Sequence, residues 1–166
     1  MTAPTASGIA PIVVFAIGNP SRGDDAIGPL LGERLQAELA RRGWPAQAQV
    51  EVIAEQQLVV EHVLDLVGRQ AALFLDAAAQ GAEPVSLITL EPALAPVVTS
   101  HRVSPTDLLG LFRAHMRATP PPAELLAVVA DGFELGAALS AAGRERLEAA
   151  WTRLQAWVDD QTRQIR

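Results

Sequence analysis

Hydrophobic and polar residues follow one another along the chain in blocks that predict alternating strands and helices. Continuous apolar runs rich in β-branched residues are typical of buried strands, and they cover residues 12–17, 50–54, 71–76, 85–90 and 124–130. Apolar residues at helical spacing predict helices over about 25–42, over 59–67 with Val59, Val63, Leu64 and Val67 on one face, and over the last part of the chain. Ser140 is the predicted N-cap of this last helix, and Ser104 is the predicted N-cap of one further helix.

The lengths of the connections predict how the strands run. A parallel crossover needs about a dozen residues, whereas eight residues separate Asp76 from Val85, so we expect the third and fourth strands to be antiparallel neighbours. Elsewhere strands and helices alternate, which favours parallel βαβ units. The sequence therefore predicts an α/β fold: a three-layer α/β/α domain over residues 11–166 with a mixed, mostly parallel five-stranded sheet, its fourth strand antiparallel. Residues 1–10 are expected to form a flexible N-terminal tail.

Composition excludes several kinds of chemistry. The chain has 166 residues, a net charge of −6 and no cysteine, and its 13 basic residues are all arginine. Thiolate nucleophiles, disulfides and a phosphate-loop lysine are therefore excluded, and an acidic chain without a basic cluster is not expected to bind nucleic acid. No apolar run approaches the ~18 residues of a membrane span, and no signal peptide is recognisable. We expect a cytoplasmic monomer that has no membrane partner.

One stretch stands out, "AIGNPSRGDDAIG" at residues 16–28. It joins a predicted strand to a predicted helix, as phosphate-binding loops do, but its glycine spacing fits neither G-x-G-x-x-G nor the P-loop. Asp24 and Asp25 would repel a phosphate and favour a cation. Either aspartate could instead cap the helix.

Polar residues from three segments are expected at the same edge of the sheet. Ligands of such sheets bind at the carboxyl ends of the parallel strands, where Asp24 and Asp25 follow the first strand and Asp76 ends the third. The connection that precedes Ser104 can return His101 to this edge. Two carboxylates and an imidazole suit Ni, Zn, Mn or Fe, and they could also act as acid and base without metal. The alternative, non-functional interpretations are that Asp76 is a turn residue at the end of a strand and that His101 is an exposed loop residue.

Three other titratable residues lie at or near the predicted elements. Glu55, which follows the second strand, reaches the same edge and could hydrogen-bond to a residue of the site. His62 is expected to pack on a helix, and His115 to lie at the C-terminal end of one.

The chain resembles the nickel–iron hydrogenase maturation endopeptidases. The stretch "FAIGNPSRGDDAIGPLLGERL" is similar to their amino-terminal signature G-x-G-N-x-x-R-x-D-[DE]-x-x-G, and "LFLDAA", "SHRVSPTDLLGL" and "FELGAALS" extend the likeness from about residue 11 to 158. Two positions depart from it. Ala16 stands where a glycine is common, and "SPT" replaces the "SPH" in which some members carry a metal-binding histidine, whereas others carry it in a pair like "SH" at 100–101.

The resemblance implies a function and a site. Members cut a C-terminal extension from the hydrogenase large-subunit precursor after nickel is inserted. Their metal ligands correspond to Asp25, Asp76 and His101, with the two aspartates as the catalytic candidates and the nickel supplied by the precursor. The implied fold is a mixed five-stranded sheet between helices. A non-catalytic nickel-sensing docking protein and a hydrolase that works without metal stay open as alternatives.

Overall fold

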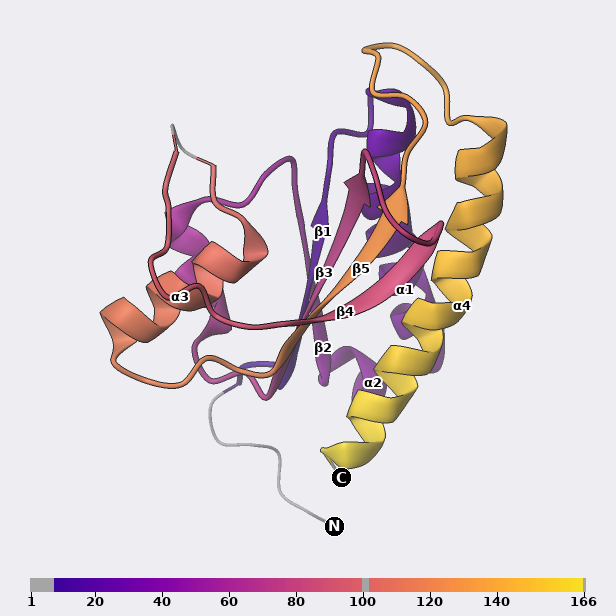
Figure 1. Ribbon diagram of the computed structural model, residues 1–166. Helices are drawn as coiled ribbons and strands as arrows, with labels where there is room; N and C mark the ends of the chain where they lie inside the picture. The colour runs from indigo at the N-terminus through magenta and orange to yellow at the C-terminus, as the bar shows by residue number, and fades with distance from the viewer. Residues whose placement is uncertain (1–7, 100–101, 166) are drawn as a thin grey trace.

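The computed structural model describes residues 8–99 and 102–165, and these residues form three layers, with one sheet between two layers of helices (Figure 1). The strands are β1 (Ile12–Ile17), β2 (Val50–Glu55), β3 (Ala71–Ala78), β4 (Val85–Leu90) and β5 (Ala123–Val129). Their order across the sheet is β2-β1-β3-β5-β4, with β4 antiparallel to β5 and the other pairs parallel. The predicted α/β/α class, the mixed sheet and the antiparallel fourth strand are confirmed.

The predicted pairing of the third and fourth strands is wrong, because β5 lies between β3 and β4. The connection over residues 79–84 passes around the end of β5. Pro84 O accepts the Val129 N–H at 2.9 Å, and Ala78 O accepts the Ala130 N–H at 2.8 Å. Two strand spacings amount to about 10 Å, which six extended residues span easily. A short connection therefore fixes the opposite direction of β4, but it does not make β3 and β4 neighbours.

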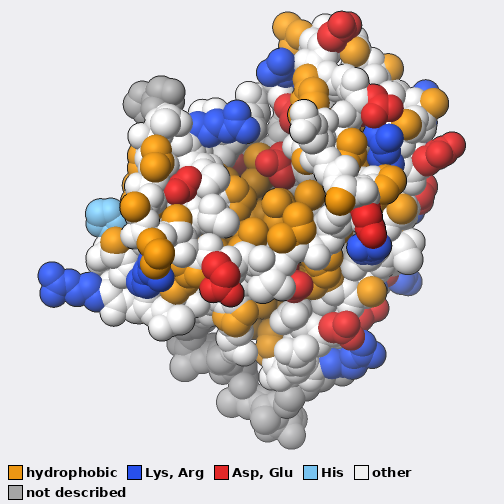
Figure 2. Space-filling model, viewed as in Figure 1, with side chains coloured by type: hydrophobic (Ala, Val, Ile, Leu, Met, Phe, Trp, Pro, Cys, Tyr) orange, Lys and Arg blue, Asp and Glu red, His pale blue; other side chains and the backbone are white. Residues whose placement is uncertain are grey.

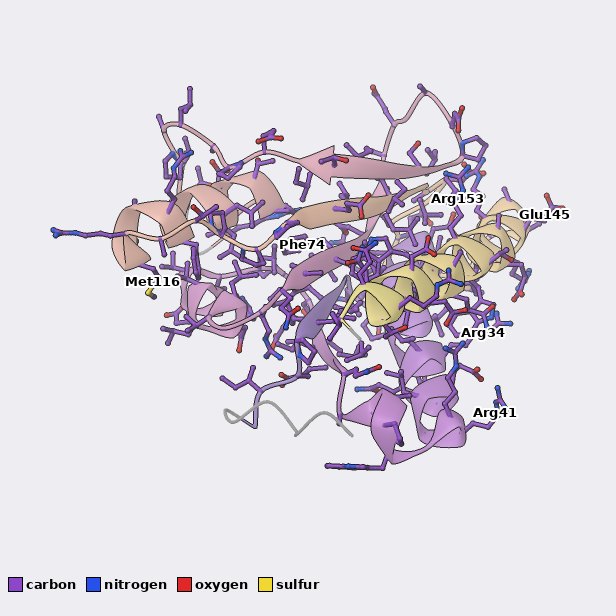
Figure 3. All side chains as sticks on the ribbon, turned by 90° about the horizontal axis from the view of Figure 1, so that it is seen from below. Arg34, Arg41, Phe74, Met116, Glu145 and Arg153 are labelled. Carbon is purple, nitrogen blue, oxygen red and sulfur yellow. The ribbon has the colours of Figure 1, made fainter. Side chains whose placement is uncertain are left out.

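Helices cover both faces of the sheet (Figure 1). Helices α1 (Ile27–Arg42) and α4 (Ala141–Gln164) pack on one face, and α3 (Pro105–Met116) and the 3₁₀ helix η2 (Val60–Leu66) pack on the other. Two shorter helices, η1 (Gly23–Ala26) and α2 (Trp44–Gln47), flank α1. In the core on the α3 side, Phe74, labelled in Figure 3, stacks on Phe15 with 5.0 Å between ring centroids.

The serine caps are confirmed, but one helical face is not. Ser104 Oγ accepts the Asp107 N–H, and Ser140 Oγ accepts the Gly143 N–H at 2.8 Å, so each serine caps the helix predicted for it. The expected face over 59–67 is wrong in part, since Leu64 is 66% exposed and Leu66 is buried. The segment is a tight 3₁₀ helix with about three residues per turn, so the 3.6-residue period used for the prediction does not hold there.

Glycines bring α1 close enough to the sheet to place the turn before it. A Cβ on Gly28 would lie 2.0 Å from Ile17 O, and one on Gly32 would lie 2.5 Å from the Ala16 Cβ. The methyl group of Ala16, where the related signature has glycine, therefore fills space that Gly32 leaves. Both α1 contacts fix the start of the helix over the end of β1.

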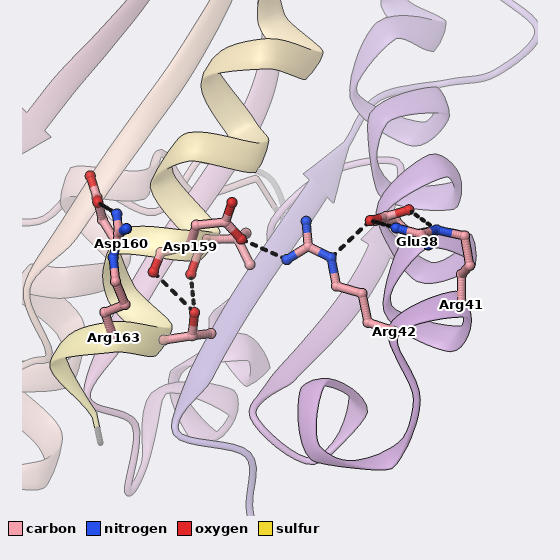
Figure 4. A network of polar contacts seen from close by, with 8 residues as sticks. Glu38, Arg41, Arg42, Asp159, Asp160 and Arg163 are labelled. Carbon is pink, nitrogen blue, oxygen red and sulfur yellow. Dashed lines mark hydrogen bonds and ion pairs between the residues drawn. The ribbon is translucent and has the colours of Figure 1, made fainter.

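An arginine on the surface joins the two helices of this layer. Arg42 donates to Glu38 within α1 at 2.8 Å and to Asp159 of α4 at 2.6 Å (Figure 4). Exposed pairs of this kind contribute about 1 kcal/mol or less, so the apolar stripe of α4 carries most of the packing. Its buried residues include Ala150, Trp151, Leu154 and Val158, and Leu147 is half-buried. Among the helices described, none is long and apolar enough to span a membrane.

Candidate functional site

The turn between β1 and α1 holds Asp25 in place. Gly18 has φ +143°, and a Cβ there would lie 2.0 Å from Asp25 O, so this position requires glycine. The Asn19 backbone N–H donates to Oδ2 of Asp25 at 2.9 Å, and the Ser21 N–H donates to the Asn19 side chain at 2.9 Å. The other carboxylate oxygen of Asp25 makes no hydrogen bond with any described residue. Asp25 is therefore oriented through one oxygen, with the other left for a ligand.

Asp24 has a structural role and is completely buried. It accepts hydrogen bonds from the Asp131 N–H at 2.9 Å, the Ser140 N–H at 2.7 Å and the Ser140 hydroxyl at 2.7 Å. Burial by itself would raise the pKa of Asp24, but these hydrogen bonds and the charge of Arg146 lower it overall. Asp24 thus ties the turn to the loop that precedes α4, and it does not cap α1.

Backbone hydrogen bonds fasten the same turn to residues 131–139. The Asp24 N–H donates to Gly132 O, the Gly23 N–H to Ala137 O and the Gly136 N–H to Ser21 O, at 3.0, 3.2 and 2.7 Å. Two loops far apart in sequence therefore form one rigid wall beside Asp25.

Asp76 lies on the face of β3 that α3 covers, next to Ala127 of β5. Its pKa is raised to about 6, first because the carboxyl is desolvated by burial and then because Asp25 carries a like charge nearby. The charge of Arg102 and the Ala77 N–H lower the pKa in part. The two aspartates predicted for the site therefore lie close enough to repel one another.

Both aspartates line one cavity of about 360 Å³. Its other lining residues include Asn19, Arg22, Arg102 and Phe133. The Arg22 guanidinium donates to Phe133 O at 3.0 Å and so joins the turn to the opposite loop. Sequence reasoning assigned no role to the two arginines, although Arg22 stands in the signature and Arg102 follows His101 directly.

The third predicted ligand, His101, lies outside the described residues. Within residues 8–99 and 102–165 no group of three or more His, Asp and Glu residues is placed to hold a metal ion. The described part of the site offers two carboxylates, which suit a hard or borderline divalent cation, and a complete set needs further donors.

The remaining candidates do not line this cavity. His62 is buried, accepts the Val59 N–H at Nδ1 over 2.9 Å and packs edge-on against Phe15. Glu55 is exposed, with 3.9 Å between its Oε1 and His62 Nε2. His115 is exposed near the end of α3. The expected packing role of His62 is thus confirmed, with the difference that it packs into the core.

Solved structures with the same architecture include several that are described as maturation proteases. One is described as the hydrogenase maturating endopeptidase HybD from E. coli, with 20% identity, 90% of this chain and 93% of that chain covered and a TM-score of 0.66. Another is the [NiFe] hydrogenase maturation protease HycI from Thermococcus kodakarensis KOD1, with 26% identity, coverage of 92% and 94% and a TM-score of 0.63. This chain has the fold of the hydrogenase maturation endopeptidases. The resemblance inferred from sequence is confirmed, whereas no family model and no curated protein matches the sequence.

We expect Asp24→Asn to destabilise the protein by about 2–4 kcal/mol, because an amide group would face donors that now meet a charged acceptor. Since the folded pKa of Asp24 is lowered, its stabilisation is present above the unfolded value of 3.8 and is lost as pH falls through the folded pKa. Urea unfolding at pH 7 measures the change. Asp131→Asn, at an exposed residue paired with Arg146, is the matched control, and equal stability of the two variants would contradict the role of Asp24.

A second prediction concerns pH. The folded pKa of Asp76, about 6, lies above the unfolded value of 3.8, so the native state binds a proton that the unfolded chain releases between these values. The free energy of unfolding therefore falls as pH rises through this window. Asp76→Asn removes this pH-dependent loss of stability. The free energy of unfolding of the variant should therefore exceed that of the wild type by nearly zero at pH 4 and by about 1–2 kcal/mol at pH 7. Unfolding in chelator-containing buffer tests this, and a difference that does not change with pH would contradict it.

Proposed function

We propose that this protein is an endopeptidase that removes the C-terminal extension of a nickel–iron hydrogenase large-subunit precursor after nickel insertion. One observation carries the proposal: Asp25 and Asp76, from separate segments of the chain, line one cavity in a fold shared with structures described as hydrogenase maturation proteases. The partner is the precursor, and the nickel arrives as part of it.

The charges of the site support a role in engaging a cation. Burial and like charge hold the pKa of Asp76 at about 6, so two ionised carboxylates in this cavity repel one another until a positive charge comes between them. A metal carried by the precursor relieves that repulsion and is bound by the free oxygen of Asp25 and by Asp76. His101 supplies the third contact in this proposal.

The chain's own residues also limit the mechanism. Cysteine is absent from the sequence, and among the described residues that line the cavity there is no serine or histidine. A covalent acyl-enzyme is therefore not part of the proposal. A metal bound next to a peptide carbonyl supplies Lewis acidity, while the aspartates orient it. Asp76 lines the same cavity and is the candidate acceptor for the proton of an attacking water.

We expect the wild-type protein to shorten nickel-loaded precursor and to leave nickel-free precursor intact, because the metal completes the contact with the two carboxylates. Asp25→Asn should lower the rate at least about 100-fold while keeping wild-type stability, since the amide oxygen can still accept the Asn19 N–H. Mass spectrometry of the precursor gives the cleavage rate, and urea unfolding gives the stability.

The other outcomes separate the competing functions. Binding of the loaded precursor without loss of mass would favour a nickel-sensing docking protein. Cleavage that is indifferent to nickel and to His101→Gln would favour a hydrolase that works without metal. Cleavage at the wild-type rate by Asp25→Asn would overturn the site assignment.

A further inference from the structure

A second cavity, of about 390 Å³, adjoins the first and shares the walls made by Ile17, Gln57, Asp76 and Arg102. It leads from the carboxylates to the N-terminal end of α3, where Ser104 and Asp107 line it. The two cavities form one two-lobed cleft with Asp76 at its centre. We call the part beside α3 the second lobe.

Acid–base groups in the second lobe are already engaged. Asp107 accepts the Ser104 hydroxyl through Oδ2 and the Val97 N–H, at 3.0 Å, through Oδ1. The hydrogen bond from Ser104, followed by the one from Val97, lowers the pKa of Asp107 against the effect of burial. Neither Ser104 nor Asp107 is free to act as nucleophile or general base, so this lobe has the character of a binding surface.

Arg102 is the charged donor among the described residues of this lobe. Its backbone is fixed by a bridge to Thr99, in which the Arg102 N–H donates to Thr99 O at 2.7 Å. Its guanidinium makes no hydrogen bond or ion pair with residues 8–99 or 103–165, yet its charge reaches Asp76. A guanidinium has donors and no acceptor, so a group that binds it must offer an oxygen.

Apolar residues line part of the second lobe, beside polar ones. Leu58 and Val103 form buried walls at 2% and 3% exposure, and Val97 stands at the rim at 59% exposure. The rim is held to α3, because the Val97 N–H binds Asp107 and the Ala93 N–H binds Thr106 O at 2.9 Å. Figure 2 shows hydrophobic side chains gathered in the hollow of one face, with acidic and basic side chains at its upper end. A cleft with both apolar walls and a guanidinium donor suits an extended peptide, which can offer an apolar side chain and a backbone carbonyl oxygen together.

We propose that the second lobe is the subsite for the precursor segment next to the bond that is cut. An apolar side chain of this segment lies against Leu58 and Val103, and a backbone carbonyl accepts from the Arg102 guanidinium. This inference rests on the proposed function, because the cavity with the carboxylates must hold the bond itself. Arg102 is then a positioning residue for the peptide, and it makes no contact with the reacting atoms.

The test is steady-state cleavage of nickel-loaded precursor by two independent variants. Thr99→Trp fills the second lobe and leaves the charge near Asp76 in place, and Arg102→Gln removes the donor. Each should raise KM about tenfold or more, the pattern of lost substrate binding. For Thr99→Trp kcat should stay within about threefold, whereas Arg102→Gln also removes a charge that lowers the pKa of Asp76. Arg102→Lys, which keeps one charged donor, should recover part of the loss.

Thr119→Trp is the matched control, because Thr119 is exposed between α3 and β5 at the opposite end of the sheet. It should leave both constants unchanged. If Thr99→Trp also leaves KM within about twofold of wild type, the subsite is overturned while the proposed function stands. If the wild-type protein cuts neither form of the precursor, both inferences fall.

Discussion

The buried carboxylate of Asp24 is the constraint on which the site depends. It has no exposed surface, and its hydrogen bonds from Asp131 and Ser140 join the turn after β1 to the start of α4. The fit is tight, since a Cβ on Gly143 would lie 2.4 Å from the Oδ1 of Asp24. Because each hydrogen bond to a charged group contributes about 1.5–3 kcal/mol, the turn has little freedom to move. The adjacent Asp25 is thereby held toward the cavity.

The second consequence is electrostatic. Two adjacent aspartates of one turn differ in their electrostatic role. Hydrogen-bond donors lower the pKa of Asp24, whereas the charge of Asp25 raises the pKa of Asp76 across the cavity. The protein thus stabilises the buried carboxylate of Asp24 by hydrogen bonds, whereas the carboxylates of Asp25 and Asp76 repel one another. Arg102 relieves part of that repulsion. A site in this state binds a cation more readily than a neutral group, and the proposed nickel of the precursor fits it on that ground.

The features predicted correctly from the sequence are those that depend on interactions between residues close together in the chain. The caps at Ser104 and Ser140 depend on residues three positions apart, and the apolar runs of the sheet are recognisable without any neighbour, so both were predicted. The position of β5 between β3 and β4 could not be predicted, because the short connection constrains direction more strongly than adjacency. The sequence likewise placed Asp25 and Asp76 at one edge through strand topology. It did not indicate the partners of Asp24, which lie more than 100 residues away, or the position of Arg102 between two cavities.

The central claim is that Asp25 and Asp76 together engage the metal of a loaded precursor. The most direct measurement is X-ray absorption at the nickel edge of that precursor, free and in complex with this protein. We expect oxygen donors to join the nickel shell when the wild-type protein binds, and not to join it when the Asp25→Asn, Asp76→Asn double variant binds. A nickel shell that is the same in both complexes would contradict the account.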